Sequence, residues 1–122
     1  METLTKKEEE IMNIIWQLEN AMVRDVIKQL PEPHPPNSTV SSVVRILEKK
    51  GFVGHKAYGK THEYYPLISK SAYRKASFKS LMEKYFSGSY KQLVSFMVQE
   101  ELTEKEAEEL NKHLEQQLKK KS

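Results

Sequence analysis

Small hydroxyl and basic side chains repeat at helical spacing in the middle of this chain. Ser38, Ser41, Ser42 and Arg45 follow the spacing i, i+3, i+4, i+7, with Lys49 one turn further along. Residues at this spacing share one face of an α-helix. Small hydroxyls allow close approach to base pairs, and an arginine can bond a guanine or a phosphate. The pattern predicts a helix that binds the DNA major groove through Ser38, Thr39, Ser41, Ser42, Arg45 and Lys49.

An ordinary solvated helix face is the alternative interpretation of the same residues. Exposed helix faces more often carry Glu, Lys and Gln, because serine is a weak helix former. The local charge also favours a contact surface, since residues 37–62 hold five basic side chains against Glu48 alone. Residues 69–91 continue this excess, with six basic side chains against Glu83. Clustered basic charge suits a polyanionic partner.

Three short amphipathic helices are predicted to position this face. Their apolar stripes are Ile11-Ile14-Ile15-Leu18, Val23-Val26-Ile27-Leu30 and Val40-Val43-Val44-Leu47, each at the period of an α-helix. A capping box of Thr5 and Glu8 predicts that the first helix runs from Thr5 to Leu18. Prolines within 31–36 end the second helix and predict a rigid extended connector. Asn37, Ser38 or Thr39 is expected to cap the third helix, which Gly51 ends.

A β-hairpin is predicted directly after the third helix. Residues 52–58 and 61–65 are rich in aromatic and β-branched side chains, Gly59-Lys60 forms the turn, and Pro66 stops the second strand. Three helices followed by a hairpin are the order of a winged helix-turn-helix. Lys56 and Lys60 on this wing are expected to contact phosphates, which supply affinity without reading sequence.

The C-terminal part is predicted to be helical and to dimerise. Helices are expected from Ser69 to about Phe86, from Ser89, and from a second capping box at Thr103. About fifty residues bury too little apolar surface alone, so a second copy is expected to cover it. The residues assigned to this contact are Phe78, Leu81, Tyr85, Leu93, Phe96, Met97, Leu110 and Leu114. Packing back onto the N-terminal domain is the alternative. The predicted domains are therefore 1–68, which binds DNA, and 69–122, which dimerises.

Catalytic and metal-binding patterns are not found in the sequence. The four histidines lack His-Glu-x-x-His spacing, the four glycines form no phosphate-binding loop, and cysteine is absent. We therefore expect no enzyme, no metal and no cofactor. No apolar run of about 18 residues and no secretory signal is visible, which predicts a cytoplasmic protein without membrane insertion.

The sequence resembles the penicillinase repressor family of winged-helix regulators. The matching stretches are Ile11-Met12-Asn13-Ile14-Ile15-Trp16, Ser38-Thr39-Val40 through Leu47, Lys49-Lys50-Gly51-Phe52-Val53, Tyr64-Tyr65-Pro66-Leu67, Leu93-Val94-Ser95-Phe96 and Glu100-Glu101-Leu102-Thr103. They cover nearly the whole chain in the family's order. The tryptophan motif of the first helix and the Lys-Lys-Gly-Phe step are the more specific parts.

The resemblance implies a homodimeric repressor that binds inverted-repeat operators in double-stranded DNA. Family members control genes for a β-lactamase or an altered penicillin-binding protein, and a membrane sensor with a metalloprotease domain relieves repression. That protease cuts the family's dimerisation region at an Asn-Phe bond. Ser95 and Phe96 occupy that position here, so the candidate cleavage site carries Ser in place of Asn. The cysteine cluster of the related copper-responsive repressors is absent.

Two other functions remain open from the residues alone. The first is a winged helix that docks another protein, with the C-terminal helices as a partner surface. The second is a DNA-binding regulator that responds to a small molecule held between its helices.

Overall fold

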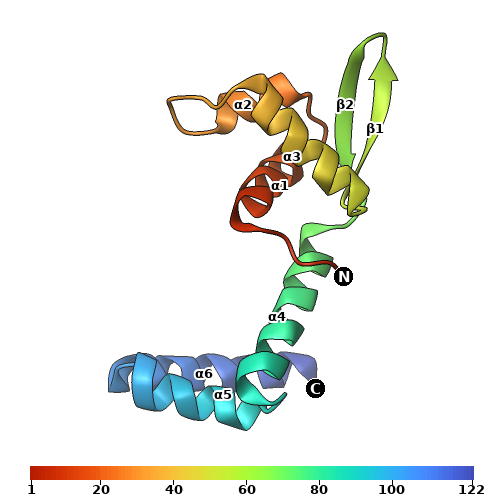
Figure 1. The fold of residues 1–122 in the computed structure, drawn as a ribbon. Helices are drawn as coiled ribbons and strands as arrows, with labels where there is room; N and C mark the ends of the chain where they lie inside the picture. Colours follow the sequence, from red (N-terminus) through yellow and green to blue (C-terminus); the bar gives the residue numbers. More distant parts are fainter. The chain divides into compact units, whose positions relative to one another are not determined.

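The computed structural model describes all 122 residues and is mostly helical, with one two-stranded hairpin (Figure 1). The elements are α1 (Lys6–Leu18), α2 (Val23–Gln29), α3 (Asn37–Lys49), β1 (Val53–Tyr58), β2 (Thr61–Pro66), α4 (Lys70–Phe86), α5 (Tyr90–Phe96), the π-helix η1 (Met97–Glu101) and α6 (Glu104–Lys121). Three helices followed by a hairpin confirm the predicted winged-helix order. The chain divides into two compact units, unit 1 (Met1–Ala76) and unit 2 (Ser77–Ser122).

The core of unit 1 is built from the predicted apolar stripes. Ile11, Ile15, Val40, Leu47 and Phe52 are fully buried where α1, α3 and the start of the hairpin meet. Each buried side chain of this size stabilises the fold by roughly 1.5–3 kcal/mol relative to exposure. Burial of these stripes fixes which side of α3 faces the core, and therefore which side faces solvent.

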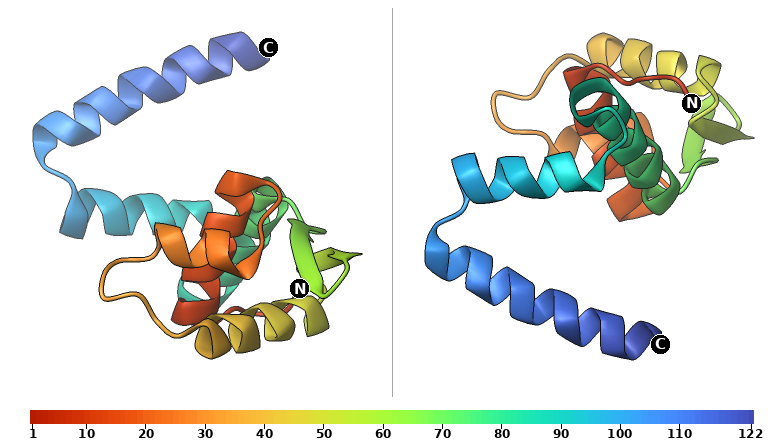
Figure 2. Two further views of the ribbon diagram at one scale, coloured as in Figure 1. Left: turned by 90° about the horizontal axis from the view of Figure 1, so that it is seen from above. Right: turned by 90° about the horizontal axis from the view of Figure 1, so that it is seen from below.

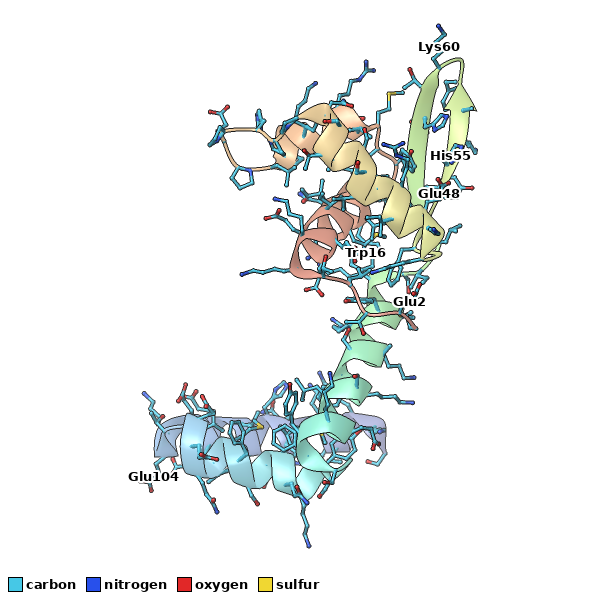
Figure 3. All side chains as sticks on the ribbon, viewed as in Figure 1. Glu2, Trp16, Glu48, His55, Lys60 and Glu104 are labelled. Carbon is cyan, nitrogen blue, oxygen red and sulfur yellow. The ribbon has the colours of Figure 1, made fainter.

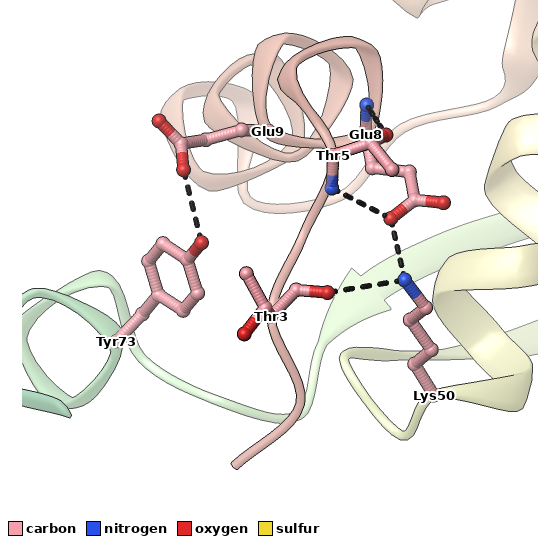
Figure 4. A network of polar contacts seen from close by, with 6 residues as sticks. All are labelled: Thr3, Thr5, Glu8, Glu9, Lys50 and Tyr73. Atoms are coloured by element: carbon pink, nitrogen blue, oxygen red, sulfur yellow. Dashed lines mark hydrogen bonds and ion pairs between the residues drawn. The ribbon is translucent and has the colours of Figure 1, made fainter. Parts of the chain in front are cut away.

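A polar network ties the N-terminal residues to the end of α3 (Figure 4). Thr5 and Glu8 form the predicted capping box at the start of α1. The Glu8 Oε1 atom also accepts a hydrogen bond from Lys50 Nζ at 2.6 Å, and Lys50 Nζ donates to the Thr3 carbonyl oxygen at 3.2 Å. Lys50 and the Thr5 backbone amide together hold the pKa of the Glu8 carboxyl below its ordinary value. Lys50, counted above with the basic cluster, is therefore paired inside the unit.

The start of α3 differs from the prediction. Its N-cap residue is Pro36, and no side chain caps the helix. Asn37, Ser38 and Thr39 instead form the first turn of the helix. The proline connector keeps the backbone extended up to Pro36. The Pro36 carbonyl oxygen then accepts hydrogen bonds from the amides of Thr39 and Val40. At the other end Gly51 has a φ of +84°, the left-handed conformation that glycine adopts readily after a helix.

The hairpin pairs antiparallel, with Val53 opposite Pro66 and Tyr58 opposite Thr61. Pro66 therefore ends β2 as a paired residue, one position later than predicted, which a proline can do at a strand end where no ladder donor is needed. An isolated bridge between Ala21 and Tyr64 joins the hairpin to the segment before α2.

The first turns of α4 pack with unit 1. The Tyr73 ring lies 5.6 Å from the rings of both Trp16 and Phe52, and its hydroxyl donates to Glu9 at 2.9 Å. Trp16 Nε1 donates to the Ile68 carbonyl oxygen just before α4. Residues 69–76 thus belong structurally with unit 1, whereas the predicted division lay at 68/69.

Unit 2 consists of the rest of α4 with α5, η1 and α6. Ser89 caps α5, and Thr103 forms the predicted capping box with Glu106. Met82 is the one buried side chain of this unit. The helices α5 and α6 diverge from the turn at Leu102 and Thr103 (Figure 2). No helix of the chain is long and apolar enough to span a bilayer.

Candidate nucleic-acid interface

The predicted DNA-binding residues of α3 lie on its solvent side. Ser38, Thr39, Ser42, Arg45 and Lys49 are exposed, and Ser41 is half-buried. Val40, Val44 and Leu47 on the opposite side are buried in the core. The helix therefore presents these six residues, here termed the α3 polar face, because its apolar stripe is held against α1 and α2.

Two side chains of the α3 polar face, Ser42 and Arg45, donate hydrogen bonds to backbone carbonyls of their own helix. Ser42 Oγ donates to the Ser38 carbonyl oxygen at 2.9 Å, and Arg45 Nε donates to the Ser41 carbonyl oxygen at 3.3 Å. The terminal guanidinium nitrogens of Arg45 and the ammonium of Lys49 have no carboxylate partner. These cationic groups remain available for an external acceptor, while the serine oxygens can still accept.

The two lysines predicted on the wing differ in their surroundings. Lys60 lies at the hairpin turn and projects from its tip (Figure 3). Lys56 on β1 lies directly opposite Glu63 on β2. Facing side chains on neighbouring strands are about 5 Å apart at Cβ, so Lys56 has a carboxylate neighbour that Lys60 lacks. Lys60 is the stronger candidate for a phosphate contact.

The carboxylate of Glu48 and the imidazoles of His55 and His62 join α3 to the hairpin, a contact that no sequence pattern predicted. Glu48 Oε2 lies 2.5 Å from His55 Nδ1, and the two side chains meet across α3 and β1 (Figure 3). The His55 ring stacks on the His62 ring at 4.2 Å, with 12° between the planes. The register of the hairpin could have indicated this contact. His55 lies opposite Tyr64, two residues from His62, and such diagonal neighbours are within reach of ring side chains.

The structure holds no group of three or more His, Cys, Asp or Glu side chains that could bind a metal ion. The stacked pair of His55 and His62 sits above Tyr64, whose ring centroid is 5.7 Å from that of His55. Burial raises the pKa of Tyr64, and the negative charge of Glu48 raises it further. Tyr64 therefore remains a neutral anchor at the base of the hairpin, where it also pairs with Ala21.

The residues predicted to dimerise are largely uncovered in unit 2. Exposure ranges from 36% to 71% for Phe78, Leu81, Tyr85, Phe96, Leu110 and Leu114, while Leu93 and Met97 are half-buried. Two ring contacts, Phe78 with Tyr90 and Phe86 with Phe96, join α4 to α5. Within one chain this unit therefore leaves many of its large apolar side chains exposed to water.

The candidate cleavage site lies at a change of helix type. Ser95 and Phe96 are the last two residues of α5, and the π-helix η1 starts at Met97. Both side chains are exposed and line a shallow surface hollow of about 700 Å³ together with Phe86 and Gln92.

Comparison with known proteins gives one consistent result. Residues 4–116 match the family model described as penicillinase repressor. The methicillin resistance regulatory protein MecI of Staphylococcus aureus is 32% identical over 110 residues, covering 88% of this chain and 89% of that protein. The penicillinase repressor of Bacillus licheniformis is 27% identical over 115 residues, covering 93% and 90%. The chain belongs to the penicillinase repressor family of transcriptional regulators.

Proposed function

We propose that this chain is a repressor that binds inverted-repeat operators in double-stranded DNA as a homodimer. The observation that carries the proposal is the α3 polar face. It combines small hydroxyl side chains with Arg45 and Lys49, two cations without carboxylate partners, beside a hairpin tipped by Lys60. The major groove admits a helix of this kind, and the hairpin offers a second, phosphate-directed contact.

Dimerisation is proposed from the uncovered apolar surface of unit 2. A unit of 46 residues with one buried side chain cannot be stable by its own burial. A second copy of the same surface covers it with two-fold symmetry, which is the commonest oligomer symmetry. The resulting pair of α3 helices suits two operator half-sites.

Relief of repression by proteolysis between Ser95 and Phe96 is the third part of the proposal. A protease must unwind its substrate, and the junction of α5 with the π-helix η1 has no buried side chain to oppose local opening. A cut there separates the dimerisation surface into two parts, with Phe78, Leu81, Tyr85 and Leu93 on one fragment and Phe96, Met97, Leu110 and Leu114 on the other. The proposed protease is a membrane sensor with a metalloprotease domain, and the proposed target genes are of the β-lactam-resistance type named for the relatives.

The test of DNA recognition compares Arg45→Ala with Lys60→Ala by gel shift. The probes are a duplex from the promoter of the chain's own operon and a scrambled duplex of equal length. Arg45→Ala should lose about 1–3 kcal/mol of preference for the promoter sequence, whereas Lys60→Ala should weaken both probes evenly. Equal affinity of the unaltered protein for the two probes would overturn the repressor proposal and favour a protein-docking winged helix.

The test of release follows the chain in cells before and after exposure to a β-lactam. Mass spectrometry should find a fragment that ends at Ser95, and Phe96→Ala should slow its appearance. A cut at another bond would contradict the assignment of this site.

A further inference from the structure

A polar cleft lies between α2, the start of α3 and the end of the hairpin. It has a volume of about 350 Å³, and its polar lining is Arg24, Asn37, Ser41, Lys60, Thr61 and His62. All of these residues belong to unit 1. Ser41 and Lys60 belong to the proposed DNA contact, and Arg24 reaches the same cleft from α2.

The charges of this cleft are of one sign. Arg24 and Lys60 are exposed, and neither takes part in an ion pair. No carboxylate lines the cleft. The nearest acid in the sequence, Asp25, accepts a hydrogen bond at 2.9 Å from the Met22 backbone amide at the start of α2. Two cations from separate elements therefore share one hollow without a counter-charge.

Neighbouring side chains hold two of the neutral groups of the cleft, Asn37 and His62, in place. Ser41 Oγ donates to Asn37 Oδ1 at 3.1 Å, which leaves the Asn37 amide hydrogens without a protein acceptor. His62 is fixed by stacking on His55, which Glu48 holds in turn. The cleft thus presents two cations and the amide hydrogens of Asn37 and is lined by no carboxylate, so a ligand that matches it must supply acceptors and negative charge.

We propose that this cleft binds one backbone phosphate of the DNA strand, held between Arg24 of α2 and Lys60 of the hairpin. The inference rests on the proposed DNA-binding function. A phosphodiester offers negative oxygens and no donors, which suits a cleft of this composition, whereas a base edge presents donors as well as acceptors. A phosphate held from both sides fixes the register in which the α3 polar face meets the bases.

The experiment measures duplex binding against salt concentration for the full chain and for Arg24→Ala. The matched control is Lys28→Ala, which removes an exposed cation from the same helix, one turn away and outside the cleft. Arg24→Ala should weaken promoter and scrambled duplexes about tenfold alike and reduce the slope of log affinity against log salt by about 1. Lys28→Ala should reduce this slope by less than Arg24→Ala does.

A second measurement identifies the phosphate itself. Neutral methylphosphonate linkages are placed one at a time through the footprinted site. Among the positions that weaken the unaltered protein, one in each half-site should have no further effect on either Arg24→Ala or Lys60→Ala. Different positions for the two variants, or equal losses for Arg24→Ala and Lys28→Ala, would overturn the shared phosphate.

Failure of this inference can be told apart from failure of the proposed function. Unchanged affinity of Arg24→Ala for both duplexes, together with a promoter preference that is lost in Arg45→Ala, would reject the cleft and leave the repressor intact. Inorganic phosphate, compared with chloride at equal ionic strength, tests a free anion as occupant. Binding of inorganic phosphate to the unaltered protein but not to Arg24→Ala, with duplex affinity equal for the two proteins, would assign the cleft to the free anion instead.

Discussion

The two units of this chain contrast in what covers their apolar side chains. In unit 1 the stripes of α1, α2 and α3 cover one another, and Phe52 and Val53 close the core from the hairpin. In unit 2 Met82 alone is buried, while aromatic and leucine side chains along α4, α5 and α6 face water. Both units have well-formed helix caps, so local helix signals do not distinguish them. The difference is that unit 1 buries its apolar side chains within one chain, whereas those of unit 2 would be covered only by the proposed dimer.

The largest expected effect is in the core of unit 1. Phe52→Ala removes a fully buried ring that contacts Tyr73, and should lower the free energy of unfolding by about 3–5 kcal/mol. Urea denaturation followed by Trp16 fluorescence measures this, because Trp16 lies in the same cluster. Phe78→Ala in unit 2 is the control and should leave the Trp16 transition almost unchanged. Equal decreases in the free energy of unfolding for the two variants would contradict the conclusion that only unit 1 is stabilised by its own buried side chains.

The dimer contact should respond nearly as strongly. Leu114→Glu introduces a charge on each copy of the exposed apolar face of α6, and should raise the dissociation constant about a hundredfold, equivalent to about 2.7 kcal/mol. Sedimentation equilibrium gives the constant directly. Gln116→Glu adds the same charge on the opposite side of α6 and should leave the dimer intact. If both variants remained dimeric, α6 would lie outside the interface.

The hydrogen bonds that Glu8 accepts from Lys50 and from the Thr5 backbone amide should contribute about 2 kcal/mol to the free energy of unfolding of unit 1. This contribution requires an ionised Glu8 carboxylate. The folded-state pKa of Glu8 lies below its ordinary value, so its carboxylate stabilises the fold at neutral pH. This contribution should decline as the pH falls below about 4.3 and through the lower folded-state value. The measurement is the stability difference between the unaltered chain and Glu8→Gln from pH 7 to pH 3.

Glu10→Gln serves as the control for Glu8. Glu10 belongs to α1 as well, but its ion pair with Lys7 is exposed to solvent. Exposed pairs of this kind contribute little, so Glu10→Gln should be close to neutral at every pH. A constant difference for Glu8→Gln across the range would contradict an ionised Glu8 as the source of the effect.

The smallest effect compares the two capping boxes. Thr5→Ala and Thr103→Ala each remove an N-cap hydroxyl, a change that costs about 1 kcal/mol of helix stability. In unit 1 the loss should appear as a lower midpoint of the whole transition, because α1 is packed in the core. In unit 2 it should appear only as faster amide hydrogen exchange in the first turn of α6. A shift of the unit 1 midpoint by Thr103→Ala would mean that the two units unfold together.

Local signals in the sequence predict most of the fold. The threonine capping boxes, the apolar stripes and the glycine after α3 each act over a few residues, so they can be recognised without tertiary information. The exposed side of α3 followed from the buried side by helical geometry. The cap of α3 was the exception. The helix begins directly after the proline connector, so Pro36 occupies the N-cap position and Asn37 is already the first helical residue.

Contacts between distant segments could not be predicted in the same way. Lys50 looked like part of the basic cluster until α1 brought Glu8 beside it. Arg24 and Lys60 are far apart in sequence and share a cleft only because α2 and the hairpin flank α3. The change from α5 to a π-helix at Met97 has no local pattern that we can identify.

The contact between Glu48 and His55 has a consequence for the entropy of binding. A two-stranded hairpin alone is marginally stable in water. Here it is fastened at its base by the Ala21 and Tyr64 bridge and along β1 by Glu48, which leaves only the turn around Gly59 and Lys60 unattached. The conformational freedom of the wing is therefore largely lost when the chain folds. A wing that is already ordered loses less entropy when it binds its partner. Less of the free energy of each contact is then offset, and the complex should dissociate more slowly.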